Sequence, residues 1–203
     1  FLYKNYKPNS IDDFDEYLGK NNLIFKRLLN LTNYYHQMPH LLIYGIDIIN
    51  NFNIIIFFLK KCYKIDNIIY NELKLSNNTK KDLIIKYNKN FFLIDIQLLK
   101  NRDYQLFPLF INKLAKTKNI SNNLFNLVIV INAHLASYKF FQKLKSIIDK
   151  YTENIRFIII TKNLSNINKL LLSHFTFIRI SNPDYSNIIK NIVKKNNKRL
   201  SKK

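Results

Sequence analysis

The sequence predicts an α/β domain built around a parallel β-sheet. Short apolar runs of strand length alternate with longer segments in which apolar residues recur with a helical period. One run, Leu127–Ile131 (LVIVI), is continuous and mostly β-branched, which is typical of a parallel strand buried on both faces. The chain has 203 residues and is 47% hydrophobic, which is enough for one core of this kind.

The first half of the chain begins extended over Phe1–Phe14 and continues into a helix over Leu18–Tyr35. A buried strand, His40–Tyr44, ends at Gly45, and a helix is expected from about Asn51 to Tyr63. Between residues 64 and 95 the alternation of apolar and polar residues predicts two or three short strands before a core strand over residues 91–96. A hairpin turning at residues 77–78 is one arrangement of those strands.

The second half continues the alternation of helices and strands. Its expected elements are helix Asp103–Lys116 (kinked or started at Pro108), strand Leu127–Ile131, helix Tyr138–Tyr151, strand Arg156–Thr161, helix Asn166–Ser173, strand Phe175–Ile180 and helix Ser186–Lys195. A basic tail follows over residues 196–203.

The net charge of +20, from 33 Lys and Arg against 13 Asp and Glu, has two explanations. A polyanionic partner such as nucleic acid is one. The other is an AT-rich genome, because Lys, Asn and Ile are abundant together. Arginines are few, which disfavours base-specific readout but not the tracking of phosphates by lysine.

Cysteine and histidine usage excludes several classes of protein. The one cysteine, Cys62, rules out a disulfide framework and a cysteine-based zinc site, and it fits a reducing compartment. The four histidines have no metal-ligand spacing. No apolar run approaches the roughly 18 residues of a membrane span. The N-terminal segment FLYKNYKP also lacks the apolar core of a signal peptide, so a non-secreted protein is expected.

The turn after the first strand has the frame of a phosphate-binding loop without its chemistry. In the pattern GxxxxGK[ST], counted from Gly45, the second glycine, the lysine and the hydroxyl residue fall on Asn50, Asn51 and Phe52. Such a loop needs glycines to aim amides at phosphates, a lysine to reach the outer phosphates and a hydroxyl to hold magnesium. Of these residues only Gly45 remains.

Several segments match, in order, the motif series of one family. They are Leu2–Pro8 with Ile11–Phe14 (aromatic-x-x-KYRP…LDDF), Met38–Gly45 (PHLLFYG), Leu127–Thr152 (the Walker B strand and the helix after it) and Asn154–Phe157 (NxRF). In this order the chain resembles a small subunit of replication factor C, a clamp loader of the AAA+ class. The strands of residues 64–95 and the run Asn101–Asp103 most resemble the eukaryotic subunit that is ATPase-defective.

The resemblance covers nearly the whole chain and implies a domain organisation. A AAA+ P-loop NTPase-like three-layer domain with a parallel five-stranded sheet would occupy residues 1–182. The first helix of a lid and the basic tail would occupy residues 183–203, and the helical collar of the family is absent from this sequence. A fragment and a reduced relative both remain open.

Carried over position by position, the resemblance implies that the chain is not an ATPase. The Walker A lysine and hydroxyl fall on Asn51 and Phe52, and the Walker B acids on Ile131 and Asn132. The sensor asparagine falls on Lys162, with Asn163 one residue away. The arginine finger falls on His174, which is shorter than arginine and mostly neutral at pH 7.

The resemblance also suggests binding residues. Tyr3, Tyr6, Pro8 and Gly45 would form a residual nucleotide pocket, in which ATP or ADP binding without hydrolysis stays open. First turns of helices facing the loader's channel would bring lysine and arginine to DNA, and the candidates are Lys60, Lys61, Lys100 and Arg102. The helix between the Walker strands would contact the sliding clamp through Tyr104, Leu106 and Phe107. A solvated surface and core packing are the respective alternatives.

The leading hypothesis is a non-hydrolysing structural subunit of a DNA sliding-clamp loader, acting in replication beside an active ATPase neighbour. Its partners would be other clamp-loader subunits, the sliding clamp and primer–template DNA, without a membrane. It would reside in the nucleus or in a viral or organellar replication compartment. A stand-alone basic nucleic-acid-binding domain and a divergent active ATPase remain as alternatives.

Overall fold

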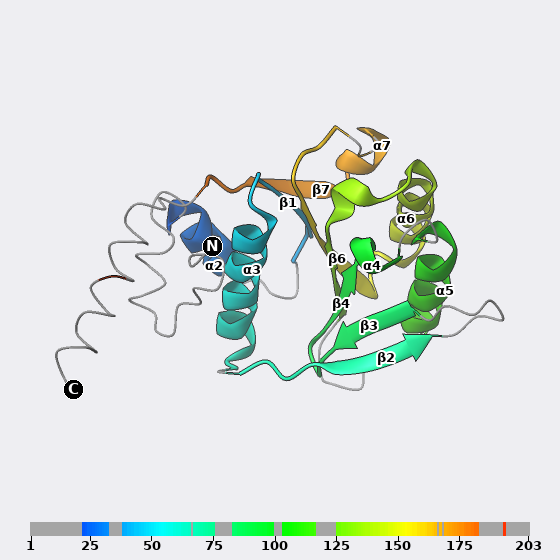
Figure 1. Ribbon diagram of the computed structural model, residues 1–203, viewed down its shortest axis with the longest axis horizontal. Coiled ribbons are helices and arrows are strands. Elements are labelled where there is room, and N and C mark those ends of the chain that lie inside the picture. The colour runs from blue at the N-terminus through cyan, green and yellow to red at the C-terminus, as the bar shows by residue number, and fades with distance from the viewer. Residues whose placement is uncertain are drawn as a thin grey trace.

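A seven-stranded sheet forms the middle of the molecule, with the strand order β2-β3-β4-β5-β6-β1-β7. The computed structural model describes residues 22–32, 38–65, 67–75, 83–99, 103–116, 125–165, 167, 169–182 and 193. The strands are β1 (His40–Tyr44), β2 (Asn71–Leu75), β3 (Leu83–Tyr87), β4 (Phe91–Asp95), β5 (Asn126–Ile131), β6 (Ile155–Thr161) and β7 (Phe175–Arg179). Figure 1 shows the sheet between two groups of helices.

Five neighbouring strands, β4, β5, β6, β1 and β7, are parallel, and β2 and β3 extend the sheet as an antiparallel hairpin. The prediction of a mostly parallel α/β sheet is therefore confirmed. The sheet has seven strands rather than five, because the short strands expected between residues 64 and 95 join it. The connection between β2 and β3, including Asn77 and Asn78, lies outside the described residues.

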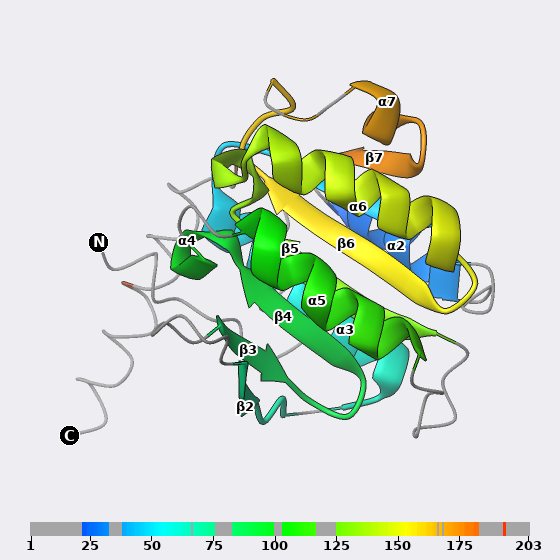
Figure 2. The same cartoon turned by 90° about the vertical axis from the view of Figure 1, so that its right-hand side faces the viewer.

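Helices cover both faces of the sheet. One side carries α2 (Asn22–Thr32) and α3 (Ile48–Tyr63), and the other carries α5 (Asp103–Lys116) and α6 (Tyr138–Tyr151). Figure 2 shows α5 and α6 in front of the sheet, with α2 and α3 behind it. The short helices α4 (Ile96–Leu99), η5 (Ala133–Leu135) and α7 (Lys169–Leu172) complete the described elements.

Alternate residues of the central strands enter two separate cores. Leu41, Ile43 and Ile129 face α3, whereas Leu42 and Val128 face α5 and α6. All five are 0% exposed, which explains why the central strands are apolar on both faces. The predicted burial of these strands on both faces is thus confirmed.

Local sequence explains where the helices begin. Ser137 caps α6, because its Oγ accepts a hydrogen bond from the Phe140 amide, and the helix spans the predicted residues Tyr138–Tyr151. Helix α3 starts at Ile48, earlier than the predicted Asn51, because Asp47 caps it. Pro108 lies inside α5, which already begins at Asp103, so the alternative of a helix starting at Pro108 was wrong.

The N-terminal segment before residue 22 and the expected lid helix and tail over residues 183–203 lie outside the described residues, apart from Val193. In the part of the chain that is described, no helix combines the length and apolar character needed to cross a membrane.

His40 is a buried polar residue that links two strands. Its side chain is 5% exposed, and its Nδ1 accepts a hydrogen bond from the Phe157 amide of β6 at 3.1 Å. Burial, with smaller contributions from the charges of Arg156 and His174, lowers its pKa from 6.5 to about 4. His40 is therefore neutral at pH 7.

We expect His40 to make the protein acid-sensitive. Between pH 6.5 and 4 the unfolded chain binds a proton at His40 that the folded chain does not, so the free energy of unfolding falls as pH falls, by up to about 3 kcal/mol. Urea unfolding at several pH values should show this slope. In His40→Asn, which keeps an acceptor near Nδ1, the slope should flatten; an unchanged slope would assign the acid sensitivity to other groups.

Candidate functional site

The parallel strands β1, β4, β5 and β6 end at one edge of the sheet, which is called the carboxyl edge below. In open α/β sheets, ligands bind outside this edge. Tyr44, Asp95, Ile131 and Thr161 are the last strand residues there. The positions expected from the sequence motifs for the phosphate loop, the Walker B acids and the sensor all lie at this edge. They are Ile131 and residues that follow the strand ends.

The turn between β1 and α3 contains only Gly45, Ile46 and Asp47. The Asp47 carboxylate accepts hydrogen bonds from the Ile49 amide at 3.0 Å and the Asn50 amide at 3.1 Å. Free amides at the start of a helix are the groups that bind phosphate in a phosphate-binding loop. Here a carboxylate of the chain itself binds two of them.

Asn51, at the position of the expected lysine, points back to the turn. Its Nδ2 donates a hydrogen bond to the Gly45 carbonyl at 3.1 Å, and the side chain is 1% exposed. A lysine in a phosphate-binding loop reaches outward to the ligand, whereas this amide closes the turn on itself. Phe52 is half-buried in the core under α3.

Gly45 has a packing role in this turn. A Cβ atom on Gly45 would lie 2.4 Å from the Ile180 carbonyl oxygen, so only glycine fits. The Gly45 amide also donates to the Thr161 carbonyl at 3.2 Å, and the Ile180 amide donates to the Tyr44 carbonyl at 2.9 Å. The backbone at the end of β1 is thus held between the last residue of β6 and the residue that follows β7.

A carboxylate that sequence reasoning missed lies at the end of β4. Asp95 Oδ1 accepts hydrogen bonds from Asn132 Nδ2 at 2.8 Å and from the Gln97 amide at 2.9 Å. Asn132 stands at the second Walker B position and has a left-handed backbone (φ 57°), which asparagine tolerates better than most residues. The signal available in the sequence was an acidic residue ending a buried strand, next to the Walker B strand.

The sensor region is formed by polar contacts within one turn. The Thr161 hydroxyl donates to the Asn163 carbonyl at 2.8 Å, and the Ser165 hydroxyl donates to Asn163 Oδ1 at 3.0 Å. Lys162 is exposed. Burial, and secondly the charge of Lys162, lowers the pKa of His134. Lys162 therefore adds a positive charge to the carboxyl edge near η5.

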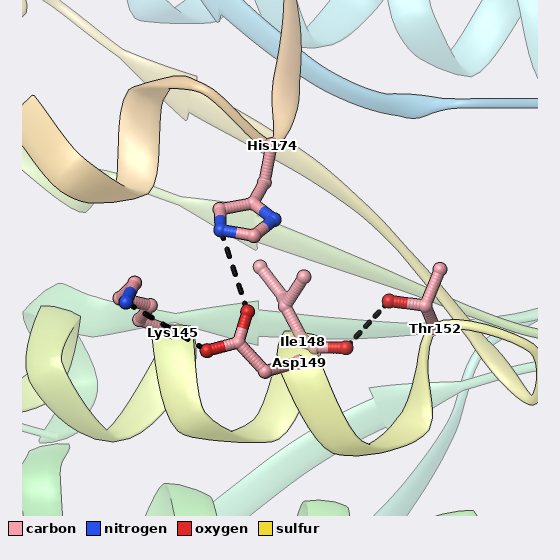
Figure 3. A network of polar contacts seen from close by, with 5 residues as sticks. All are labelled: Lys145, Ile148, Asp149, Thr152 and His174. Atoms are coloured by element: carbon pink, nitrogen blue, oxygen red, sulfur yellow. Dashed lines mark hydrogen bonds and ion pairs between the residues drawn. The ribbon is translucent and has the colours of Figure 1, made fainter.

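His174 is held to its own chain. Figure 3 shows its ring pointing from the start of β7 toward α6, where Nε2 lies 3.4 Å from Asp149 Oδ1. Lys145 Nζ lies 3.8 Å from the other oxygen of Asp149. Phe175 pairs with His40 at the start of β1, so His174 is at the edge of the sheet opposite Gly45.

Other predicted binding residues are placed differently from expectation. Lys60 and Lys61 lie in the last turn of α3 and not in a first turn, because the helix ends at Tyr63 as predicted. Leu106 is 9% exposed and Phe107 0%, with the Phe107 ring 4.7 Å from that of Phe140, so both are core residues and offer no apolar anchor. Tyr3, Tyr6, Pro8, Lys100, Arg102 and the side chain of Tyr104 lie outside the described residues.

No group of three or more metal-ligating side chains is found among the described residues. The chemistry available at the carboxyl edge is that of amides and carboxylates, with Lys162 as an exposed cation. The buried Asn50 side chain has no hydrogen-bond partner among the described residues.

Comparison with known proteins identifies the fold. Neither a protein-family model nor a curated protein sequence matches the chain. A single-substitution variant of RuvB from Thermotoga maritima matches with a TM-score of 0.50 and 13% identity, over 87% of this chain and 48% of that one. PCH-2 of C. elegans matches with a TM-score of 0.50 and 10% identity, over 84% and 45%.

A DNA polymerase III gamma subunit-related protein of Thermotoga maritima matches with a TM-score of 0.45 and 12% identity, over 78% of this chain and 47% of that one. The chain spans about half the length of these structures. At identities of 13% and 10%, the similarities to RuvB and PCH-2 show the fold alone, which is that of AAA+ P-loop NTPases.

We expect Gly45→Ala to destabilise the protein. The added methyl group must push away the Ile180 backbone, and overpacking of this kind costs about 1–3 kcal/mol. Urea unfolding at pH 7 measures the change. Ile46→Ala is the matched control, because Ile46 is 75% exposed and its truncation should change the free energy of unfolding by less than about 0.5 kcal/mol. Equal effects of the two variants would contradict the packing role of Gly45.

Proposed function

We propose that this chain is a non-hydrolysing structural subunit of a AAA+ assembly, and more specifically of a DNA sliding-clamp loader. The observation that carries the proposal is the closed turn after β1, in which Asp47 binds the Ile49 and Asn50 amides and Asn51 binds the Gly45 carbonyl. The AAA+ fold and the order of clamp-loader motifs in the sequence support the assignment.

Electrostatics at the turn disfavours a triphosphate. The phosphate would have to displace the Asp47 carboxylate, which loses a helix cap worth about 1 kcal/mol, and would then lie beside a like charge. No lysine follows at position 51 to offset this repulsion. At the end of β5, Ile131 cannot bind a metal ion and the Asn132 amide cannot act as a general base. These features support a subunit that takes part through contact rather than through hydrolysis.

Exposed apolar side chains at the carboxyl edge support a protein neighbour there. They follow three of the parallel strands and are 44–75% exposed: Ile46, Ile49, Leu98, Leu135 and Tyr138. Apolar side chains gathered at one edge are typical of an interaction surface. An ATPase-competent clamp-loader subunit would be this neighbour, and the sliding clamp and primer–template DNA would be partners of the whole assembly. The site of action would be the nucleus or a viral or organellar replication compartment.

A stand-alone nucleic-acid-binding domain is the second candidate, favoured by the net charge of +20. It differs from the first in needing no loader subunit. Retention of DNA binding without any loader subunit in a pull-down would favour it.

We expect magnesium ATP to bind weakly or not at all. Calorimetric titration of the full chain should show no saturation below about 1 mM, because the helix amides are already bonded and the loop cation is missing. The same preparation should not hydrolyse ATP. Hydrolysis by the purified chain that disappears in Asn51→Ala would contradict the proposal and support a divergent ATPase.

We expect the tagged chain to retain loader subunits and the sliding clamp from nuclease-treated extract of its source. Ile46→Asp with Leu135→Asp should abolish this retention, because both side chains are exposed at the carboxyl edge. Ile69→Asp is the control, since Ile69 is 78% exposed but lies before β2, outside this edge. Undiminished retention by the double variant would place the contact elsewhere, and the absence of loader subunits would refute the loader assignment.

A further inference from the structure

A second surface, distinct from the strand-end turns described above, gathers lysines from three parts of the chain. They come from the end of α3, from the hairpin β2–β3 and from the turn before β4. This surface is called the hairpin patch, and its cations are Lys60, Lys61, Lys64, Lys74, Lys86 and Lys89. All are exposed except Lys60, which is half-buried.

Contacts between the segments bring the first and last of these lysines together. The Tyr63 hydroxyl donates to the Asn90 carbonyl at 3.5 Å, so the end of α3 touches the turn before β4. The rings of Tyr70 and Phe91 lie 6.2 Å apart, which holds the segment before β2 against the start of β4. Lys64 and Lys89 belong to these joined segments.

Strand register places the hairpin lysines on the α3 side of the sheet. Leu73 pairs with Ile85, and both pack into the core under α5 and α6. Because side chains alternate along a strand, Lys74 and Lys86 must point to the other face. Lys86 also pairs with Leu93, whose side chain is in the core under α3. Two cations of the hairpin therefore lie on the same face of the sheet as α3.

The charge of this surface is unbalanced. Described residues 60–65, 67–75 and 83–90 contain six lysines and one acid, Glu72, which pairs across the strands with Lys86. By comparison, residues 103–116 and 138–153 of the α5–α6 side contain six lysines and three acids. Within the described residues, Lys60, Lys61, Lys64, Lys74 and Lys86 form no ion pair. Helix-dipole stabilisation accounts for lysines at the end of α3 but not for those of the hairpin.

We propose that the hairpin patch binds the phosphate backbone of double-stranded nucleic acid. Lysine without arginine suits phosphate tracking rather than base readout. Single-strand binding normally adds aromatic stacking platforms, and the exposed aromatic side chains of the described residues, Tyr138 and Phe177, both lie outside the patch. Binding to a membrane surface would need a broad apolar face beside the lysines, whereas the exposed large apolar residues of the patch are Ile69 and Ile84. The proposal does not depend on the clamp-loader assignment.

The test is fluorescence anisotropy of a labelled DNA duplex of about 20 base pairs, long enough for several phosphate contacts, with the full chain between about 50 and 200 mM salt. Replacing Lys74, Lys86 and Lys89 by glutamine should weaken binding at least about tenfold at about 100 mM salt. The slope of log K against log salt should fall in magnitude by about 2–3, because each phosphate contact contributes roughly 0.9. Replacing Lys60, Lys61 and Lys64 should have a similar effect, and this second variant keeps the test valid if the first does not fold.

The matched control replaces Lys113, Lys143 and Lys150, which are exposed on the α5–α6 side, and so removes the same charge. Its slope should change by less than one. Equal losses in both variants would show that only the overall charge matters and would overturn the proposal. The proposal would also be overturned if the full chain did not bind the duplex. The same holds if the lysines were needed for binding to phosphatidylserine vesicles and the duplex was not bound. None of these outcomes bears on the loader pull-down.

Discussion

Burial of the central strands on both faces is the constraint on which the rest of the structure depends. Strands β1, β5 and β6 lie between two helical layers, so their polar groups must find partners within the protein. Most polar side-chain atoms in these strands do so at the strand ends, although His40 Nε2 is buried without a partner among the described residues. Asn126 Nδ2 donates to the Leu114 carbonyl of α5, and the Thr161 hydroxyl donates to the Asn163 carbonyl. These two hydrogen bonds join strands to a helix and a turn.

Side chains at the carboxyl edge are also hydrogen-bonded within the chain. Asp47, Asn51 and Asn132 all lie at this edge, and the side chain of each is hydrogen-bonded to its own chain. Such bonds stabilise the turns without a nucleotide. The carboxyl edge can therefore keep its shape without ligand contacts, which is what the proposed structural role requires.

Much of the fold could be predicted because apolar periodicity records burial directly. Continuous runs such as Leu127–Ile131 predicted two-sided burial, and the amphipathic period of residues 138–151 predicted the bounds of α6. The start of α3 was predicted too late because residues were counted along a phosphate-loop pattern from Gly45, which hid Asp47 as a cap. Lys60 and Lys61 were assigned to a first turn from the resemblance, although a helix ending at Tyr63 already places them in its last turn. The helical period of α5 already turned Phe107 inward, so its burial followed from the sequence even though a surface role had been considered.

The site was harder to predict because its bonds join residues distant in the chain. The contact of Asp95 with Asn132 spans 37 positions, and the fit of Gly45 beneath the Ile180 carbonyl depends on strand order.

The grouping of charges on the surface also depends on the fold and not on neighbours in the sequence. A compositional bias can place lysine at any exposed position, but it does not by itself choose one face of a hairpin and the end of a helix on the same side of the sheet. The hairpin patch and the α5–α6 side are subject to the same compositional bias, yet their ratios of lysines to acids differ. The location of the lysines in the fold is therefore stronger support for a phosphate-binding surface than the net charge of the chain.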